Sequence, residues 1–298
     1  MRNPRLAMMG MVFVLSWPAA AGAEEDEAWF TGSINSTGAN GVPPGHFLAE
    51  PYLAEVIVRP DGGPSTHTAE SINLLLAGVA DNLTVGLIPR FAWRDRAEPA
   101  DLTARLQYRL TTYDPDSGRP ILALIWNETL PTGRYDNLDR AGGDGSGTGA
   151  YISAPGLALD DYFHLPGDHL MRLRIDLAYA VPTGAHIENR SVYGTQAGFS
   201  GHGWAGSQVS AVTAFEVSLS TRWALALDVD YNRGSHGSVD GSGGQHWVSG
   251  AWQSANVVPA LEYNFTADTG LIVGVQMPVW QRNTSVVVVP VAALNCVF

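Results

Sequence analysis

The feature that most constrains the fold is a two-residue alternation of apolar and polar side chains, which starts near residue 46 and recurs along the rest of the chain. In the stretch DLTARLQYRLTT, which begins at Asp101, every second residue from Leu102 to Leu110 is apolar. Successive side chains of a β-strand point to opposite faces of its sheet. The alternation therefore predicts strands with one apolar and one polar face.

The alternating segments are long. There are about twelve of them, each of about 11–15 residues, whereas strands of globular proteins usually have about 5–6 and a tilted strand that crosses a bilayer needs about 9–11. Their length favours an all-β fold, a closed antiparallel transmembrane β-barrel of about 12 strands, over a soluble sandwich. Within a barrel domain over 45–298, we expect strands near 46–59, 67–79, 82–94, 101–114, 119–131, 149–161, 168–182, 206–220, 222–234, 253–267, 270–281 and 284–298.

The connections between these segments alternate in length. Short turns rich in Asp, Asn, Gly and Pro follow the even-numbered segments, near 80–82, 114–118, 161–167, 220–222 and 266–270. The three longest connections, 132–148, 183–205 and 235–252, all fall at the opposite end. Outer-membrane barrels have short periplasmic turns and long extracellular loops. The same arrangement is expected here.

The N-terminus predicts export. Arg2 and Arg5 precede an apolar run, and Ala21-Gly22-Ala23 fits a cleavage site, so residues 1–23 are predicted to be a signal peptide. The expected location is therefore the bacterial outer membrane, reached through the periplasm. Residues 24–44 lack strand alternation, and two interpretations stay open: a periplasmic tail, or a lumen plug that tucks Trp29 and Phe30 into the barrel near arginines.

Composition excludes one class of partner. The net charge is −12, and binding to nucleic acid needs a basic surface. Charged residues make up only 15% of the chain, against roughly 25% in soluble domains. Every basic residue is arginine, and the single cysteine, Cys296, forms no internal disulfide.

The alternation also predicts which charged side chains point into the barrel, where selectivity is determined. Two interpretations stay open: a transverse field or constriction that orients a solute, or a lattice of ion pairs that fills the interior. A count of twelve strands lies between that of small barrels filled by side chains and that of large barrels with a water channel. The strand count therefore does not decide whether the lumen is open or plugged. The predicted lumen residues are Arg90, Arg94, Arg105, Arg109, Arg172, Arg174, Asp176, Glu216, Asp228, Asp230 and Glu262.

Aromatic residues lie near the ends of the predicted strands, where interfacial girdles occur. Phe298 closes the last strand, and we expect the barrel assembly machinery to recognise this terminal aromatic. On that strand Pro290, Cys296 and Phe298 share the lipid face, and Pro290 should lie at a gap in the hydrogen-bond ladder. The girdle residues are Phe91, Trp93, Trp126, Tyr231, Phe265, Trp280 and Phe298.

Seven stretches carry a family resemblance: WFTGSINSTGANGVPPGHFLAEPYLAE, GLIPRFAW, DLTARLQYRL, ETLPTGRYDNLD, SVYGTQAGFSG, LALDVDYNRG and PALEYNF. With them, roughly 28–298 resembles the outer-membrane proteins grouped as the meta-pathway of phenol degradation family, which are described as transporters. The resemblance implies an outer-membrane β-barrel related to uptake of aromatic or other hydrophobic compounds. It carries no functional residues onto this sequence.

No catalytic motif is present. The chain lacks a G-x-S-x-G elbow, and GGDGSGTG lacks the G-K-[ST] ending of a phosphate loop. His202, His236 and His246 lie in external loops without metal-ligand spacing, so we predict no metal site, no cofactor and no enzyme activity.

The predicted function is passage of small solutes, hydrophobic or aromatic ones included, through the outer membrane. The expected partners are the solute, the outer-membrane lipid and, during biogenesis, the assembly machinery. The alternatives are a structural or surface-interaction barrel with a blocked lumen and, less favoured, an outer-membrane hydrolase.

Overall fold

A computed structural model describes residues 28–60, 63–93, 97–139, 145–242 and 245–298. The predicted signal peptide and Arg94 lie outside these residues. Within the described ranges, no helix is long and apolar enough to cross a membrane.

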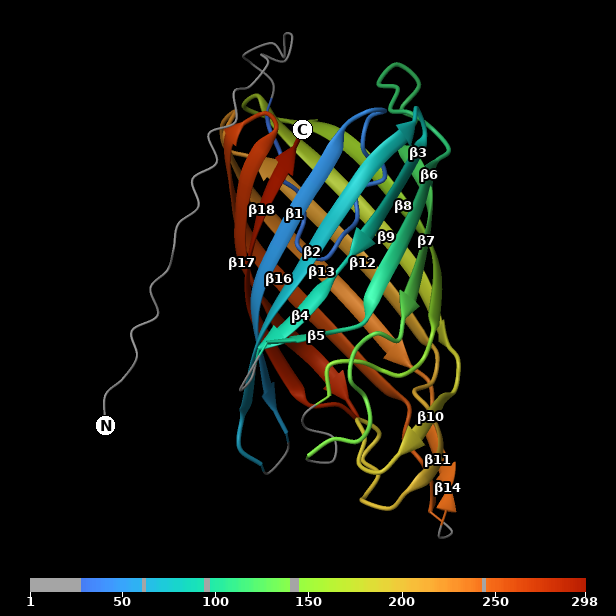
Figure 1. Cartoon of the computed structure of the whole chain (residues 1–298). Helices are drawn as coiled ribbons and strands as arrows, with labels where there is room; N and C mark the ends of the chain where they lie inside the picture. The colour runs from blue at the N-terminus through green and yellow to red at the C-terminus, as the bar shows by residue number, and fades with distance from the viewer. Residues whose placement is uncertain (1–27, 61–62, 94–96, 140–144, 243–244) are drawn as a thin grey trace, which may run out of the picture.

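The predicted closed antiparallel barrel is confirmed (Figure 1). The sheet closes because β1 pairs with β18 on one side and with β2 on the other. Its wall is formed by β1 (Phe47–Arg59), β2 (Thr66–Ala80), β3 (Leu83–Ile88), β4 (Arg90–Trp93), β6 (Leu102–Arg109), β7 (Ile121–Leu130), β8 (Ile152–Leu165), β9 (His169–Pro182), β12 (Gln208–Ser218), β13 (Trp223–Gly234), β16 (Trp252–Thr266), β17 (Thr269–Arg282) and β18 (Val286–Val297).

Two details differ from the expected boundaries. The third wall strand is divided at Pro89, because proline has no N–H to continue the ladder. The two parts, β3 and β4, both pair with β2. β4 also forms a small hairpin with β5 (Ala97–Pro99). The turn expected over 161–167 is shorter, since β8 continues to Leu165 and the chain reverses at positive-φ Gly167 and Asp168.

The barrel exterior is apolar. Burial along β13 alternates strictly, with Leu225 50%, Leu227 42% and Val229 42% exposed, while their neighbours are buried in the lumen. All the expected girdle aromatics are exposed as well. A closed barrel satisfies its backbone hydrogen bonds internally, which a membrane-spanning sheet requires. The outward apolar surface is therefore the lipid-facing surface.

The last strand lies as its pattern predicts. Pro290 and Leu294 are exposed, whereas Val291 and Ala293 are buried in the interior. The β1–β18 ladder pairs Ala54 with Val291 and resumes at Ile57 with Val288, so Pro290 lies beside an interruption. Phe298 exchanges two backbone hydrogen bonds with Phe47, of 2.8 and 3.0 Å. Its recognition by the assembly machinery stays a prediction.

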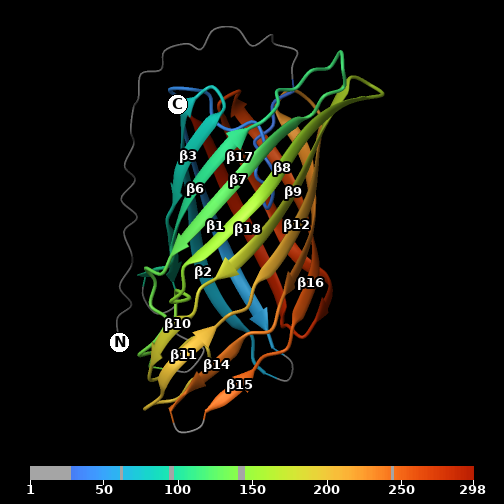
Figure 2. The ribbon, with the colours of Figure 1, turned by 90° about the vertical axis from the view of Figure 1, so that its right-hand side faces the viewer.

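The long loops contain structure that the alternation did not predict. Segments 183–205 and 235–252 form a second, four-stranded antiparallel sheet beyond the barrel rim (Figure 2), here called the outer sheet. One of its faces packs around Ile187, Phe199 and Val239. Its strands are β10 (Ala185–Glu188), β11 (Ser200–Trp204), β14 (Ser238–Gly241) and β15 (His246–Val248).

Candidate functional site

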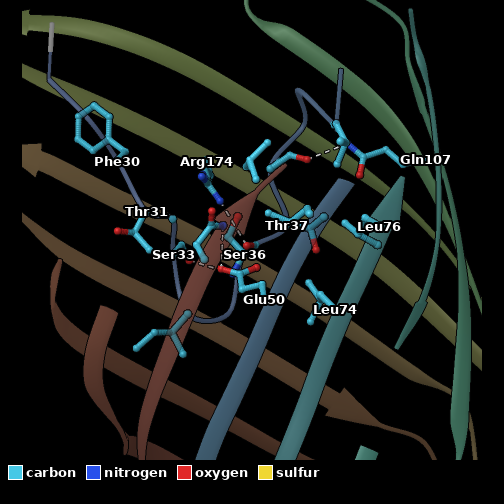
Figure 3. Close-up of a pocket in the computed structure, with 18 of the residues that line it drawn as sticks. Phe30, Thr31, Ser33, Ser36, Thr37, Glu50, Leu74, Leu76, Gln107 and Arg174 are labelled. Atoms are coloured by element: carbon cyan, nitrogen blue, oxygen red, sulfur yellow. Dashed lines mark hydrogen bonds between the residues drawn. The ribbon is translucent and has the colours of Figure 1, made fainter. Parts of the chain in front are cut away.

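The candidate site is the barrel lumen, and residues 29–42 lie inside it; we call this stretch the inserted segment (Figure 3). It is irregular backbone, so its N–H groups need partners from the wall. Inward carboxylates supply them. The N–H of Thr31 donates to Glu262 at 2.6 Å, and the N–H of Thr37 donates to Asp176 at 2.5 Å.

Asp228 and Asp230 hold the centre of the segment. Asp228 Oδ2 accepts from Ser33 Oγ and from the Asn35 N–H, both at 2.8 Å. The Asn35 amide donates to Asp230 and to Gln276, each at 3.0 Å. The acidic side chains of β13 and β16 are thus used to bind the chain's own backbone and amides.

Basic and amide groups from the facing strand bind the carbonyls of the same segment. Gln107 Nε2 donates to the Gly38 carbonyl at 2.8 Å. Arg109 donates to the carbonyl of Asn40 at 3.1 Å and to its side-chain oxygen at 2.8 Å. The segment therefore lies between acceptors on one wall and donors on the other.

Arg172, Arg174 and Glu216 form a lateral cluster. Arg172 and Glu216 are directly opposite each other on the adjacent strands β9 and β12, and their side chains form an ion pair. Arg174 Nε lies 3.6 Å from the same carboxylate, which is fully buried. Because β9 and β12 are neighbours in the wall, these three residues pair along the wall, as in the interpretation of the lumen charges as a lattice of ion pairs.

The two aromatic residues of the inserted segment lie over arginines. The Phe30 ring centroid is 4.9 Å from the guanidinium of Arg172, and the Trp29 ring centroid is 5.9 Å from that of Arg222. Such contacts are each worth about 0.5–2 kcal/mol. They fix the start of the segment at the short-turn end of the barrel.

Of the two predicted residues not yet described, Arg105 lies in the lumen near the inserted segment and Arg90 does not. Arg105 donates to Asn127 at 2.9 Å on the neighbouring strand. Arg90 is exposed and pairs with Glu70 at 3.1 Å near the long-loop end, away from the inserted segment.

Sequence reasoning missed an apolar wall on β1 and β2. Leu48, Ile72, Leu74 and Leu76 line a lumen cavity of about 390 Å³ beside the inserted segment. A signal was present, because β2 contains the run LLLAGVA, which is apolar on both faces instead of alternating.

Glu50 was missed as well. It is a buried acid on β1, and Asn295 donates to it at 3.3 Å. It lies among the leucines, because the β1–β2 ladder pairs it with Leu74, and Arg105 and Arg174 line the same cavity. The volume lies within the usual range of small-molecule sites, about 300–1,000 Å³. The arrangement suits a small solute with an apolar body and one polar group.

No family model and no curated protein matches the chain. Among solved structures, an outer membrane channel from Pseudomonas putida F1 is 16% identical, with a TM-score of 0.62 over 89% of this chain and 100% of that one. A monoaromatic hydrocarbon channel, CymD, is 9% identical over 86% of this chain and 89% of its own, with a TM-score of 0.38. A Pseudomonas aeruginosa FadL homologue is 8% identical over 85% and 89%, with the same TM-score of 0.38.

The first of these likenesses establishes a shared fold, and the other two add nothing to it. With its closed wall and lipid-facing apolar surface, the chain is a bacterial outer-membrane β-barrel.

Proposed function

We propose that this barrel is an outer-membrane channel for uptake of small hydrophobic or amphipathic solutes, aromatic ones included. The observation that carries the proposal is the lumen cavity beside the inserted segment, which is lined by the leucines of β1 and β2 together with the polar side chains of Glu50 and Arg105. The motif resemblance to the meta-pathway of phenol degradation grouping points the same way, and we propose membership of that grouping. The Pseudomonas putida F1 structure that shares the fold is named as an outer membrane channel.

The inserted segment is, in this proposal, the plug of the channel. It is held mainly by separate hydrogen bonds to side chains, such as those from Ser33 and Asn35 to Asp228. Each hydrogen bond to a charged group is worth about 1.5–3 kcal/mol. A segment held in this way is released stepwise, whereas a strand of the wall would have to break a continuous ladder.

A reversible cross-link tests the plug directly. A Cβ built on Gly270 would lie 3.1 Å from Thr31 Cβ and 2.6 Å from Asn264 Oδ1, so a small shift of the inserted segment and of the Asn264 side chain brings the two Cβ atoms to the separation of about 3.5–4.5 Å in disulfides. The variant Thr31→Cys/Gly270→Cys, in a Cys296→Ser background, should therefore form a disulfide between segment and wall. Planar-bilayer conductance and uptake of small aromatic acids into cells lacking the native protein should fall on oxidation and recover on reduction.

The Cys296→Ser protein alone is the control, and it should not respond to oxidant. Equal flux through the oxidised and reduced double-cysteine barrel would contradict a moving plug. If the reduced and native barrels also pass no solute, the blocked structural barrel becomes the better assignment.

A further inference from the structure

The exposed face of the outer sheet carries a row of metal-binding side chains. In the β-ladders His186 is opposite His202, His202 is opposite Asp240, and Asp240 is opposite His246. The row therefore crosses all four strands at one level (the strands are visible in Figure 2). The row joins residues of two separate loops, so spacing within the sequence gave no sign of it.

The alternation of buried and exposed residues along each strand shows that the row lies on the solvent-facing side of the outer sheet. Ile187 and Val239, which neighbour His186 and Asp240, are buried in the core of the outer sheet. All four residues of the row are exposed. Since residues opposite each other in a ladder share a face, these side chains project together into solvent on the extracellular side.

Three members of the row have the reach to bind one ion. Opposite residues have Cβ atoms about 4.5–5.5 Å apart, so Asp240 has a histidine one strand away on each side. An ion above Asp240 would be approached by His202 and His246 from the flanking strands. Zn²⁺ binds histidine nitrogen at about 2.0–2.1 Å and carboxylate oxygen at about 2.0–2.2 Å.

In the described residues as placed, no three such side chains converge tightly enough to hold an ion. Closing the site requires rotation of exposed side chains only, because the backbone register already aligns them.

His186, the fourth residue of the row, contacts the proposed ligand His202. The His186 ring packs edge-on against the His202 ring, with centroids 5.3 Å apart. His186 Nε2 lies 3.0 Å from Glu188 Oε1, and the same oxygen accepts from Ser200 Oγ at 2.9 Å. These contacts hold His186 in place, and its ring in turn restrains the ring of His202.

We propose that His202, Asp240 and His246 form an extracellular site for a divalent transition metal of the class that prefers imidazole, with Zn²⁺ as the reference ion. The ion would cross-link β11 to β14 and β15, and so would tie the loop over 183–205 to the loop over 235–252. This inference is independent of the proposed transport function.

The test uses the full barrel, folded in detergent and purified without a polyhistidine tag. Titration calorimetry with Zn²⁺ should show one saturable site per chain. Substitution of Co²⁺ should give the visible absorption of a site with nitrogen ligands. The variant His202→Gln/His246→Gln should lose at least about tenfold in Zn²⁺ affinity, and Asp240→Asn should lose a smaller factor.

His236→Gln is the matched control, because His236 lies in the same loop but outside the row, with Nδ1 2.9 Å from the Ser249 carbonyl oxygen. It should bind Zn²⁺ as the native protein does. Heat-modifiability on gels reports whether each barrel is folded. Absence of saturable Zn²⁺ binding by the folded native barrel, or equal affinity in the double variant, would overturn the proposal.

Discussion

The lumen has two unlike walls. On one side, the inward acids Asp176, Asp228 and Glu262 of β9, β13 and β16 bind the inserted segment. On the other side, the residues of β1 and β2 that line the cavity are mainly leucine and isoleucine, and the cavity lies between them and the same segment. The acidic side chains are occupied by the chain itself, so in the proposed channel the apolar wall is the surface that contacts the solute. Under that proposal, the interior acids hold the inserted segment, and the surface for the solute lies elsewhere in the lumen.

The largest effect is expected from the charged cluster. Glu216→Ala should lower the free energy of unfolding by about 3–5 kcal/mol, because it leaves Arg172 and Arg174 buried without their shared carboxylate. Urea unfolding in detergent or lipid measures this. Glu55→Ala removes an exposed partner of His67, so it should change stability by less than about 1 kcal/mol. Similar losses of unfolding free energy in the two variants would contradict a structural role for the cluster.

Loosening the plug should have the next largest effect. Asp228→Ala removes the acceptor for two bonds of 2.8 Å, from Ser33 and Asn35. At about 1.5–3 kcal/mol for a hydrogen bond to a charged group, the open fraction should rise at least about tenfold. Single-channel recording measures the change. Asp228→Asn keeps one acceptor oxygen and should have an intermediate effect, and no change in either variant would contradict the role of Asp228.

Two adjacent leucines of β2 point to opposite faces of the barrel wall, so they give a matched pair of variants. Leu74 lines the lumen cavity, whereas Leu75 is 48% exposed to lipid. Leu74→Asn should lower uptake of small aromatic acids about tenfold, because an amide without a partner costs about 1–3 kcal/mol in an apolar site. Leu75→Asn should leave uptake per folded barrel unchanged. Equal uptake by the two variants would show that this wall does not contact the solute.

The smallest effect concerns a turn outside the barrel wall. Ser117 Oγ donates to Asp114 at 2.8 Å, and this bond is the main cause that lowers the pKa of the Asp114 carboxyl. A lowered folded-state pKa means that the stabilisation is present above the unfolded value of about 3.9 and is lost as the pH falls through the folded value. Carboxyl NMR titration should show the pKa rising in Ser117→Ala, and an unchanged pKa would contradict this cause.

Much of the fold was predictable, because barrel strands show their orientation in a local period. Leu225, Leu227 and Val229 face lipid as the alternation requires, and Pro290 lies beside a gap in the ladder as expected. The candidate site was predictable in part. The inward direction of Asp228 and Glu262 follows from their strands, but their partners in the inserted segment do not, since Ser33 and Asp228 are 195 residues apart.

The sequence by itself determined the strand count, the lipid face and the alternation of short turns with long loops, because each depends on side-chain direction or on local turn chemistry. Only the tertiary structure decided the register between strands and the course of the segments that connect or precede them. The register of β9 against β12 made Arg172 and Glu216 an adjacent pair, and residues 29–42 came to lie between two walls of the lumen. Pairing of two distant loops aligned His202, Asp240 and His246. These contacts depend on register between distant segments, which no local pattern specifies.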